Sequence, residues 1–170
     1  MPDNRDVTTI SIAEDDPRRP DVHVLLDEHL RDMHSWSSPE SCHALDLDEL
    51  SDPGITLWTA RAGRHPAGEL LGMVALKALP GGEGEIKSMR TTNAARGRGV
   101  GRLLLERVVD AATASGWSAL VLETGTQEEF AAARRLYAAR GFVEIGPFGE
   151  YVLDPESVYM RLPLPGSRLA

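Results

Sequence analysis

Apolar residues recur every three to four positions along two long stretches of the chain, a spacing that predicts amphipathic helices. The first stretch begins at Asp21, a suitable N-cap after Pro20, and extends to about His34. The second begins near Val100 and ends before Gly116, a residue typical of helix C-termini. The apolar positions are Val22, Leu25, Leu26, Leu30 and Met33 in the first helix, and Val100, Leu103, Leu104, Val108, Ala111 and Ala112 in the second.

Short apolar and β-branched runs between turn residues predict strands elsewhere in the chain. We expect strands at residues 7–13, 55–62, 70–79, 85–91, 118–123, 142–145 and 157–162, and shorter helices at residues 45–50 and 128–140. The order is strand, two helices, three strands, helix, strand, helix and two strands, which indicates one α/β domain with a mixed sheet. The predicted domain covers residues 7–163, between flexible ends at residues 1–6 and 164–170.

The chain enters the second long helix through a turn rich in glycine and arginine, from Arg96 to Gly101. Glycines allow a ligand to approach the backbone closely, and the N–H groups of a first helical turn have no partner within the helix. These donors, the positive end of the helix dipole and the arginines together favour a phosphate. The turn lacks the Lys-Ser/Thr ending of a P-loop, and Arg102 stands where a dinucleotide-binding turn needs its last glycine. A plain surface loop is the alternative that this motif alone leaves open.

Charge narrows the expected ligand of this turn to a small polyanion. The 170 residues include 26 acidic and 18 basic ones, a formal net charge of −8, which disfavours nucleic-acid binding. Arginines nevertheless gather in one short part of this acidic chain, at Arg90, Arg96, Arg98 and Arg102. Such a local concentration of positive charge suits a small phosphorylated ligand better than a nucleic-acid duplex.

Cysteine, histidine and apolar residues are distributed in ways that disfavour other classes of protein. The chain has no run of about 18 apolar residues and no basic leader, so neither a membrane span nor export is expected. Its single cysteine, Cys42, cannot form an internal disulfide and suits the reducing cytoplasm, where we expect the protein to act. The five histidines are scattered without metal-ligand spacing, and no metal cofactor is expected.

The glycine-rich turn has the pattern Arg-x-x-Gly-x-Gly, and two further stretches accompany it. Leu136-Tyr137 is followed by Gly141-Phe142, and the strand at residues 85–91 ends five residues before Arg96. With these features in this order, the chain resembles the GNAT superfamily of acetyl-CoA-dependent N-acetyltransferases, in detail over roughly residues 70–145. The resemblance implies a GNAT-type fold, with a mixed, mostly antiparallel sheet of about six to seven strands flanked by about four helices. One departure is Phe130, where many members of the family have asparagine.

The resemblance implies that acetyl-CoA is the co-substrate and that the glycine-rich turn holds its pyrophosphate. The edge of the strand at residues 85–91 would pair with the pantetheine arm, and the N–H near Met89 would face the thioester carbonyl as an oxyanion donor. Phe130 would pack on the pantetheine. The coenzyme-binding residues expected on this basis are Met89, Arg90, Thr91, Arg96, Gly97, Arg98, Gly99, Val100, Gly101, Arg102 and Phe130.

Transfer to an amine needs an acid for the leaving thiolate and a path for the proton of the amine. The resemblance assigns the acid to Tyr137, and the alternative for this residue is an ordinary core aromatic. Glu85 is the first candidate for the base, because the period of two places it on one strand face with Lys87 and Met89. Glu123, at the end of the neighbouring strand, is the rival, and water without a dedicated base is the third option.

The acceptor site is the part that the sequence determines least. Lys87 or Arg90 could clamp a carboxylate of the acceptor, and the period of two places them on opposite strand faces, so at most one should face it. The segment after the first long helix, including His43, borders the acceptor site in the GNAT fold. The expected substrate-binding residues are Lys87, Glu123, His34, Trp36 and Glu40.

We therefore expect an N-acetyltransferase that acts on the primary amine of a small molecule, such as an amino acid or a related metabolite, by direct attack in a ternary complex. The alternatives are a non-catalytic acyl-CoA-binding sensor and an acetyltransferase of protein lysines or N-termini. The presence of Tyr137 and of a carboxylate on the central strand favours an enzyme over a sensor. Neither nucleic acid nor a membrane is expected as a partner, and a homodimer is left open.

Overall fold

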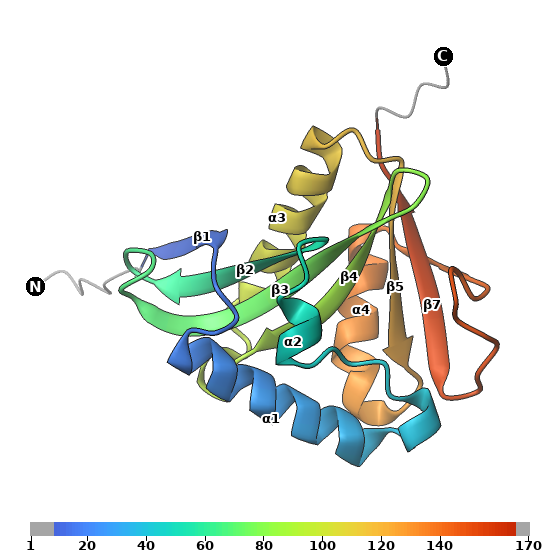
Figure 1. The fold of residues 1–170 in the computed structure, drawn as a ribbon, viewed down its shortest axis with the longest axis horizontal. Coiled ribbons are helices and arrows are strands. Elements are labelled where there is room, and N and C mark those ends of the chain that lie inside the picture. The colour runs from blue at the N-terminus through green and yellow to red at the C-terminus, as the bar shows by residue number, and fades with distance from the viewer. Residues whose placement is uncertain (1–8, 166–170) are drawn as a thin grey trace, which may run out of the picture.

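Seven strands form one open sheet in the part of the chain that the computed structural model describes, residues 9–165 (Figure 1). Their order is β1-β2-β3-β4-β5-β7-β6, and all neighbours are antiparallel except the parallel pair β4 and β5. The strands are β1 (Ile10–Glu14), β2 (Ile55–Ala62), β3 (Glu69–Leu79), β4 (Glu83–Thr91), β5 (Ala119–Gly125), β6 (Val143–Ile145) and β7 (Ser157–Pro163). The prediction of a mixed, mostly antiparallel sheet of six to seven strands is confirmed.

Four α-helices and three 3₁₀ turns connect these strands within the same residues. The helices are α1 (Pro20–Trp36), α2 (Leu47–Leu50), α3 (Val100–Ala114) and α4 (Ala131–Arg140), and the turns are η1 (Pro39–Ser41), η2 (Asn93–Ala95) and η3 (Glu128–Phe130). Local sequence explains several ends: Asp46 and Glu49 form a capping box at the start of α2, and Gly141, with a φ of 109°, ends α4. No helix within residues 9–165 is both long and apolar enough to cross a membrane.

The boundaries of some elements differ from their prediction. Helix α1 begins at Pro20, so Arg19 and not Asp21 is its N-cap residue. The helix continues past His34 to Trp36, and the segment that follows it is shorter than expected. Three predicted features lie wholly or partly outside the described residues. They are the flexible end at residues 1–6, the start of the strand at residues 7–13, and the C-terminal tail, of which only residues 164 and 165 are described. There, Leu164 is buried and its backbone N–H donates to the Ser118 carbonyl at 2.9 Å, so the ordered chain extends beyond residue 163.

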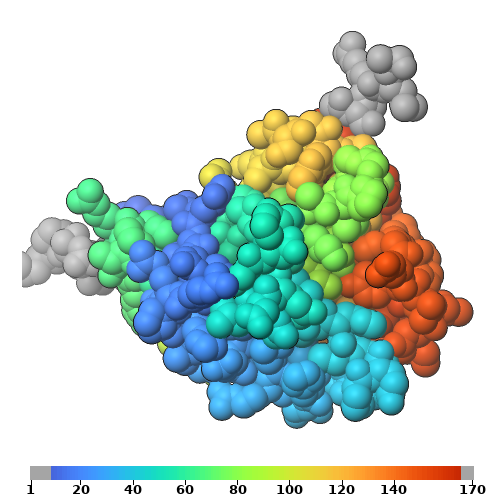
Figure 2. All heavy atoms as spheres, viewed as in Figure 1, coloured from blue at the N-terminus to red at the C-terminus, as the bar shows by residue number. Residues whose placement is uncertain are grey.

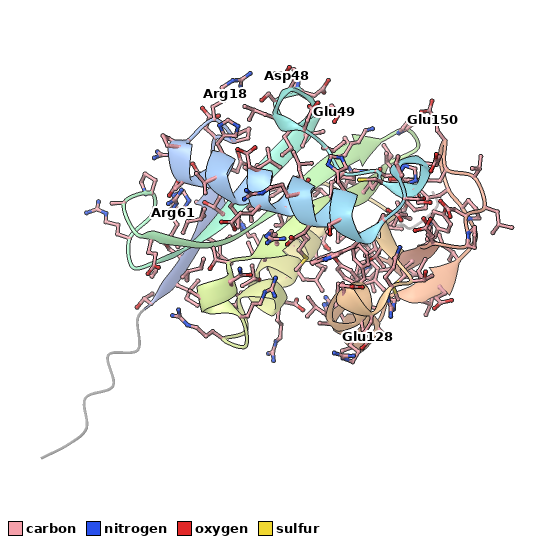
Figure 3. The ribbon with its side chains drawn as sticks, turned by 90° about the horizontal axis from the view of Figure 1, so that it is seen from below. Arg18, Asp48, Glu49, Arg61, Glu128 and Glu150 are labelled. Carbon is pink, nitrogen blue, oxygen red and sulfur yellow. The ribbon has the colours of Figure 1, made fainter. Side chains whose placement is uncertain are left out.

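The helices cover both faces of the sheet, as Figures 1 and 3 show from two directions. Helices α1 (blue) and α2 pack on one face, through a cluster of apolar side chains that includes Leu26 and Leu50. Helices α3 (yellow) and α4 (orange) pack on the other face, through a larger cluster that includes Leu104 and Tyr137. The apolar stripes that predicted α1 and α3 therefore supply most of the core on the two faces. One position is corrected: Leu103 of α3 is 42% exposed, whereas Leu105 and Val109 are buried.

The parallel strands β4 and β5 separate after a short region of pairing. They pair only from Glu83 to Glu85 on β4 and from Ala119 to Val121 on β5. Beyond these residues the facing edges of the two strands have no strand partner, although each strand remains paired on its other side. Backbone N–H and C=O groups need hydrogen-bond partners. The fork between β4 and β5 is therefore a place inside this sheet where a ligand can pair with the backbone.

A buried ion-pair cluster stabilises a different part of the molecule. Arg61 of β2 is 1% exposed, and its guanidinium lies 2.9 Å from Asp15 and 2.6 Å from Asp21. Figure 3 shows Arg61 well separated from Glu128, which begins η3 beyond the end of β5. This cluster joins β1, β2 and α1, and it takes no part in the fork.

Gly84 of β4 lies in the paired part of the fork, opposite Leu120. A Cβ atom at Gly84 would lie 2.3 Å from a ring carbon of Trp117, so the indole would have to move. We expect Gly84→Ala to lower the free energy of unfolding by about 1–3 kcal/mol, the usual effect of overpacking, as measured by urea unfolding. Gly146→Ala is the control, because nothing lies within 4 Å of its Cβ position. It should change stability by less than about 0.5 kcal/mol, and equal losses in the two variants would contradict the prediction.

Candidate active site

A cavity of about 680 Å³ lies at the fork between β4 and β5. Its lining includes β4 from Ile86 to Thr91 and β5 from Glu123 to Gly125, the residues just beyond the paired region. Helix α1, the turn before α3, and the start of α4 supply the other walls. Within residues 9–165, no group of three or more His, Cys, Asp or Glu side chains is arranged to hold a metal ion. The cavity has the size of a small-molecule site.

The turn before α3 forms one end of this cavity. Gly97 and Gly99 have φ angles of 76° and 78°, left-handed conformations that favour glycine, and α3 begins directly after Gly99. Arg96 and Arg102 line the cavity, whereas Arg98 is exposed outside the lining. No salt bridge among the described residues joins these three arginines to an acid. This end of the cavity therefore combines free helix N–H groups with positive charge, as the sequence predicted.

The side chains of β4 do not alternate as the period of two predicted. Ser88 has a φ of 50°, and the register with β3 shifts beside it, which marks a bulge that re-aims the side chains after it. Lys87 and Arg90 both contact α1 or the segment after it, whereas Met89 contacts α4. Two predictions are thus corrected: Met89 does not share a face with Glu85 and Lys87, and Lys87 and Arg90 lie on the same face.

Tyr137 of α4 packs in the core and also lines the cavity. Its ring is 6% exposed and packs 5.8 Å from the ring of Phe142 in the core. Its hydroxyl nevertheless reaches the cavity wall, where it donates to Met89 Sδ at 3.6 Å. Burial and, to a smaller degree, the Glu123 carboxylate raise the pKa of Tyr137. The phenol therefore stays protonated at physiological pH and remains a donor.

The two carboxylates predicted as base lie in different surroundings. Glu123 lines the cavity, is partly buried, and accepts a hydrogen bond from Ser157 Oγ at 2.8 Å. Burial raises the pKa of the Glu123 carboxyl group. Glu85 is 4% exposed, does not line the cavity, and accepts from the Tyr151 hydroxyl at 2.5 Å and from Lys87 at 3.3 Å. Of the two, Glu123 is the one that a ligand in the cavity can reach.

Lys87 ties two loops to β4. Its Nζ donates to Glu85 at 3.3 Å, to the His43 carbonyl at 3.2 Å and to the Tyr151 hydroxyl at 2.9 Å. The His43 ring also packs edge-on against Tyr151, with centroids 5.0 Å apart. Burial and the Lys87 charge lower the pKa of His43, so its imidazole is neutral at pH 7. The sequence analysis missed Tyr151, which no local pattern marks and which lies 64 residues from Lys87.

Glu156 was also missed, and it joins the segment after α1 to the end of β5. It accepts hydrogen bonds from Ser38 Oγ at 2.5 Å, from Ser41 Oγ at 3.1 Å and from Gln127 Nε2 at 2.9 Å. Figure 2 shows the segment after α1 (cyan) against the segment between β6 and β7 (orange). Because Ser41 lines the cavity, these bonds close the cavity wall on that side.

The residues predicted for the acceptor are only partly brought together. Trp36, the last residue of α1, lines the cavity and meets Phe130 edge to face, with ring centroids 5.6 Å apart at 89°. Phe130 lines the cavity from the other side of this contact. His34 and Glu40 are exposed and lie outside the lining. The structure thus places Trp36 and Phe130 at the cavity, but neither His34 nor Glu40.

Arg90 and His29 form a buried polar group where α1 crosses β4. Arg90 is 8% exposed and lines the cavity, with Nη1 2.7 Å from Asp32 Oδ2. Burial and the Arg90 charge lower the pKa of His29 to about 4, so this histidine is neutral at pH 7. The sequence analysis missed His29, although a signal was present. His29 follows Leu25 and Leu26 at helical spacing and therefore lies on the apolar face of α1.

Known proteins of similar sequence align with this chain along nearly their whole length. The profile of the Acetyltransferase (GNAT) family matches residues 23–142. The chain is 43% identical over 149 residues to the uncharacterized N-acetyltransferase YsnE of Bacillus subtilis, an alignment that covers 88% of this chain and 96% of that protein. It is 41% identical over 155 residues to the IAA acetyltransferase of Azospirillum brasilense, with 91% of this chain and 98% of the relative covered.

Solved structures share the fold as well. The crystal structure of a Klebsiella pneumoniae protein assigned as an acyl-CoA N-acyltransferase superposes with a TM-score of 0.76 at 27% sequence identity. The superposition covers 92% of this chain and 99% of that chain. The overall fold of this chain is therefore found in a solved protein of similar length.

Proposed function

The chain belongs to the GNAT family of acetyltransferases and is an acetyl-CoA-dependent N-acetyltransferase, and from this premise we propose that it acetylates the primary amine of a small molecule by direct attack in a ternary complex. The observation that carries the proposal is the closed wall at Glu156, where hydrogen bonds join the segment after α1 to the end of β5. The acetyl group and the acceptor would meet in a cavity whose total volume is about 680 Å³. A small acceptor fits this limit better than a protein segment.

The residues present fit acetyl-CoA. Arg96, Arg102 and the first N–H groups of α3 suit the pyrophosphate, because helix N-termini and arginines both favour phosphate. Gly101, in the first turn of α3, lines the cavity between these groups. The unpaired edge of β4 offers N–H and C=O groups for the amides of the pantetheine arm.

The side chains around the fork suit the proton transfers of the reaction. Bound acetyl-CoA supplies the thioester acetyl group. A lysine-like amine has a reference pKa about three units above neutrality, and Glu123 would accept its proton directly or through water, as a stronger base than an ordinary carboxylate. Tyr137 would donate to the leaving thiolate, and the backbone N–H near Met89 would donate to the carbonyl oxygen.

Replacing Glu123 by glutamine tests the base. We expect kcat/KM at pH 7 to fall about tenfold, less than the usual range for a general base, because water can also remove this proton before attack. In the parent enzyme the rate should fall as the pH drops through the pKa of Glu123, which burial raises above that of an ordinary glutamate. The glutamine variant should lose this acidic limb, and its deficit should shrink at high pH, where the amine is already neutral.

Two further variants make this test specific. Glu129→Gln changes another carboxylate that lines the cavity but is exposed, and it should leave the pH profile unchanged. Glu85→Gln addresses the first candidate for the base. If Glu85→Gln removes the acidic limb and Glu123→Gln does not, the assignment to Glu123 is wrong.

A coenzyme A release assay over a panel of acceptors tests the proposed function as a whole. The panel contains amino acids, polyamines, aminoglycosides and lysine-containing peptides, together with IAA, because one relative is an IAA acetyltransferase. We expect small amines to react faster than peptides. Faster reaction with peptides would favour a protein acetyltransferase, and acetyl-CoA binding without release on any acceptor would favour a sensor.

A further inference from the structure

Two cations of β4, Lys87 and Arg90, line the cavity from the same strand face, but only one of them has donors to spare. A lysine ammonium has three N–H donors and no more. Lys87 has three partners within hydrogen-bond distance, in Glu85, the His43 carbonyl and Tyr151. Its side chain is therefore saturated, and its charge is balanced by that of Glu85. Lys87 holds the walls of the cavity and has no free donor for a ligand.

Arg90 differs in its hydrogen bonding. Its Nη1 lies 2.7 Å from Asp32, whereas its Nε is fully buried and has no partner among the described residues. An unpaired buried donor is costly, so such a group in a cavity wall points to a ligand atom. Asp32 holds the guanidinium by Nη1, which leaves the edge formed by Nε and Nη2. This edge matches the two oxygens of a carboxylate in a bidentate pair.

The position of Arg90 separates this edge from the phosphate site. The bulge at Ser88 turns Arg90 toward α1, whereas Met89 and Thr91 face the side of the sheet that carries Gly101. The pyrophosphate turn therefore lies on the other face of β4. An anion bound by Arg90 belongs to the second ligand of the cavity, which is the acceptor.

The surroundings of Arg90 along α1 indicate what the rest of that ligand is like. His29 is neutral and adds no charge. One helical turn further, Met33 lines the cavity, and the next position on the same helix face is Trp36, in contact with Phe130. The wall next to the cation is thus apolar and aromatic, and it suits a hydrophobic side group.

We propose that Arg90 binds the carboxylate of the acceptor, and that the acceptor is an amine with a carboxylate and an apolar or aromatic side group that packs between Met33, Trp36 and Phe130. This proposal rests on the proposed function, and it names the substrate class of the same site. The sequence analysis listed Arg90 with the coenzyme and left open whether Arg90 or Lys87 clamps an acceptor carboxylate, and the proposal assigns that role to Arg90.

The test compares matched acceptors that differ in the carboxylate. L-Phenylalanine and 2-phenylethylamine form one pair, and L-methionine and its methyl ester form another. We expect the parent enzyme to prefer the two acids. In Arg90→Gln, kcat/KM for the acids should fall about 10- to 150-fold, the loss of one charged hydrogen-bonded contact, mainly through KM. The rates with the ester and with phenylethylamine should stay within about twofold, and calorimetry should show unchanged acetyl-CoA affinity.

Three variants separate this role from others. Arg102→Gln, in the other arginine-bearing wall, should weaken acetyl-CoA binding and leave the ratio between acid and ester unchanged. Arg90→Lys keeps the positive charge without the planar guanidinium group, and it should recover only part of the preference for acids. Because Arg90→Gln leaves Asp32 unpaired, the double variant Arg90→Gln/Asp32→Asn repeats the measurement without that charge, and thermal unfolding confirms that each variant is folded.

Several outcomes would overturn the proposal. These are equal losses on acid and ester, weaker acetyl-CoA binding in Arg90→Gln, and a parent enzyme that prefers the esters. If none of the amines tested makes the parent enzyme release coenzyme A, the proposed function fails separately. Arg90 is then judged by calorimetric binding of L-phenylalanine to the complex of enzyme and coenzyme A. Binding that Arg90→Gln abolishes supports the carboxylate site, and absent or unchanged binding rejects it.

Discussion

Gly101→Glu should weaken acetyl-CoA binding at least about 100-fold while the domain stays folded. The glutamate would add a negative charge in the first turn of α3, where the pyrophosphate is expected, and like charges brought together cost several kcal/mol. The fold should tolerate the change, because Gly101 has an ordinary φ and its Cβ would meet Leu136 at 3.4 Å, a normal contact. An acid in the first turn also suits the helix dipole. Isothermal calorimetry with acetyl-CoA measures the effect.

Gly101→Ala is the matched control, since it adds the same Cβ without the charge. It should bind acetyl-CoA within about tenfold of the parent protein, because the added atom makes only ordinary contacts. Gly99→Glu should abolish binding too, but Gly99 has a φ of 78°, so backbone strain would accompany the charge there. Unchanged affinity in a folded Gly101→Glu protein would show that the turn does not hold the pyrophosphate.

Tyr137→Phe should reduce turnover by about 10²-fold or more and leave acetyl-CoA affinity intact. The substitution removes one hydroxyl whose protein partner is a thioether sulfur, a weak acceptor, and it keeps the ring that packs on Phe142. Stability should therefore change little. The loss in rate is the contribution expected of a general acid. Because burial raises the pKa of Tyr137, the parent enzyme should show no loss of activity from phenol ionisation at or below pH 10.

Tyr159→Phe is the control for removing a phenol hydroxyl. Tyr159 is also buried, but its hydroxyl donates to the Val152 carbonyl at 2.6 Å and it does not line the cavity. Turnover should change less in this variant than in Tyr137→Phe. Near-normal turnover of Tyr137→Phe on a true acceptor would show that Tyr137 serves only the core.

The glycine-rich turn at one end of the cavity could be predicted from the sequence, because its conformation depends on neighbouring residues. A helix start with free N–H groups, glycines at left-handed positions and neighbouring arginines all lie within Arg96 to Arg102. The period of 3.6 likewise placed most of the apolar faces of α1 and α3, since these faces depend on residues three and four apart, but it wrongly put Leu103 on the buried face of α3. Family resemblance then added Tyr137, which the structure places at the cavity wall.

The acceptor end could not be predicted in the same way. The rule of alternation failed at Ser88, because one bulged residue reverses the faces of all residues after it, and no local signal marks the bulge. Glu85 and Glu123 both lie near the fork. Tyr151 and Lys87 pack on Glu85 and hydrogen-bond to it, so Glu123 is the one of the two carboxylates that lines the cavity.

Propensity, periodicity and helix capping act between neighbours in the chain, so the sequence alone predicts the elements, their order and the glycine-rich turn before α3. Which side chains share the cavity depends on contacts between distant parts of the chain. Glu156 bonds Ser38 across 118 residues, and Tyr151 bonds Lys87 across 64. Such contacts form when two loops close over the same sheet, and their energy depends on distances that no spacing along the chain encodes.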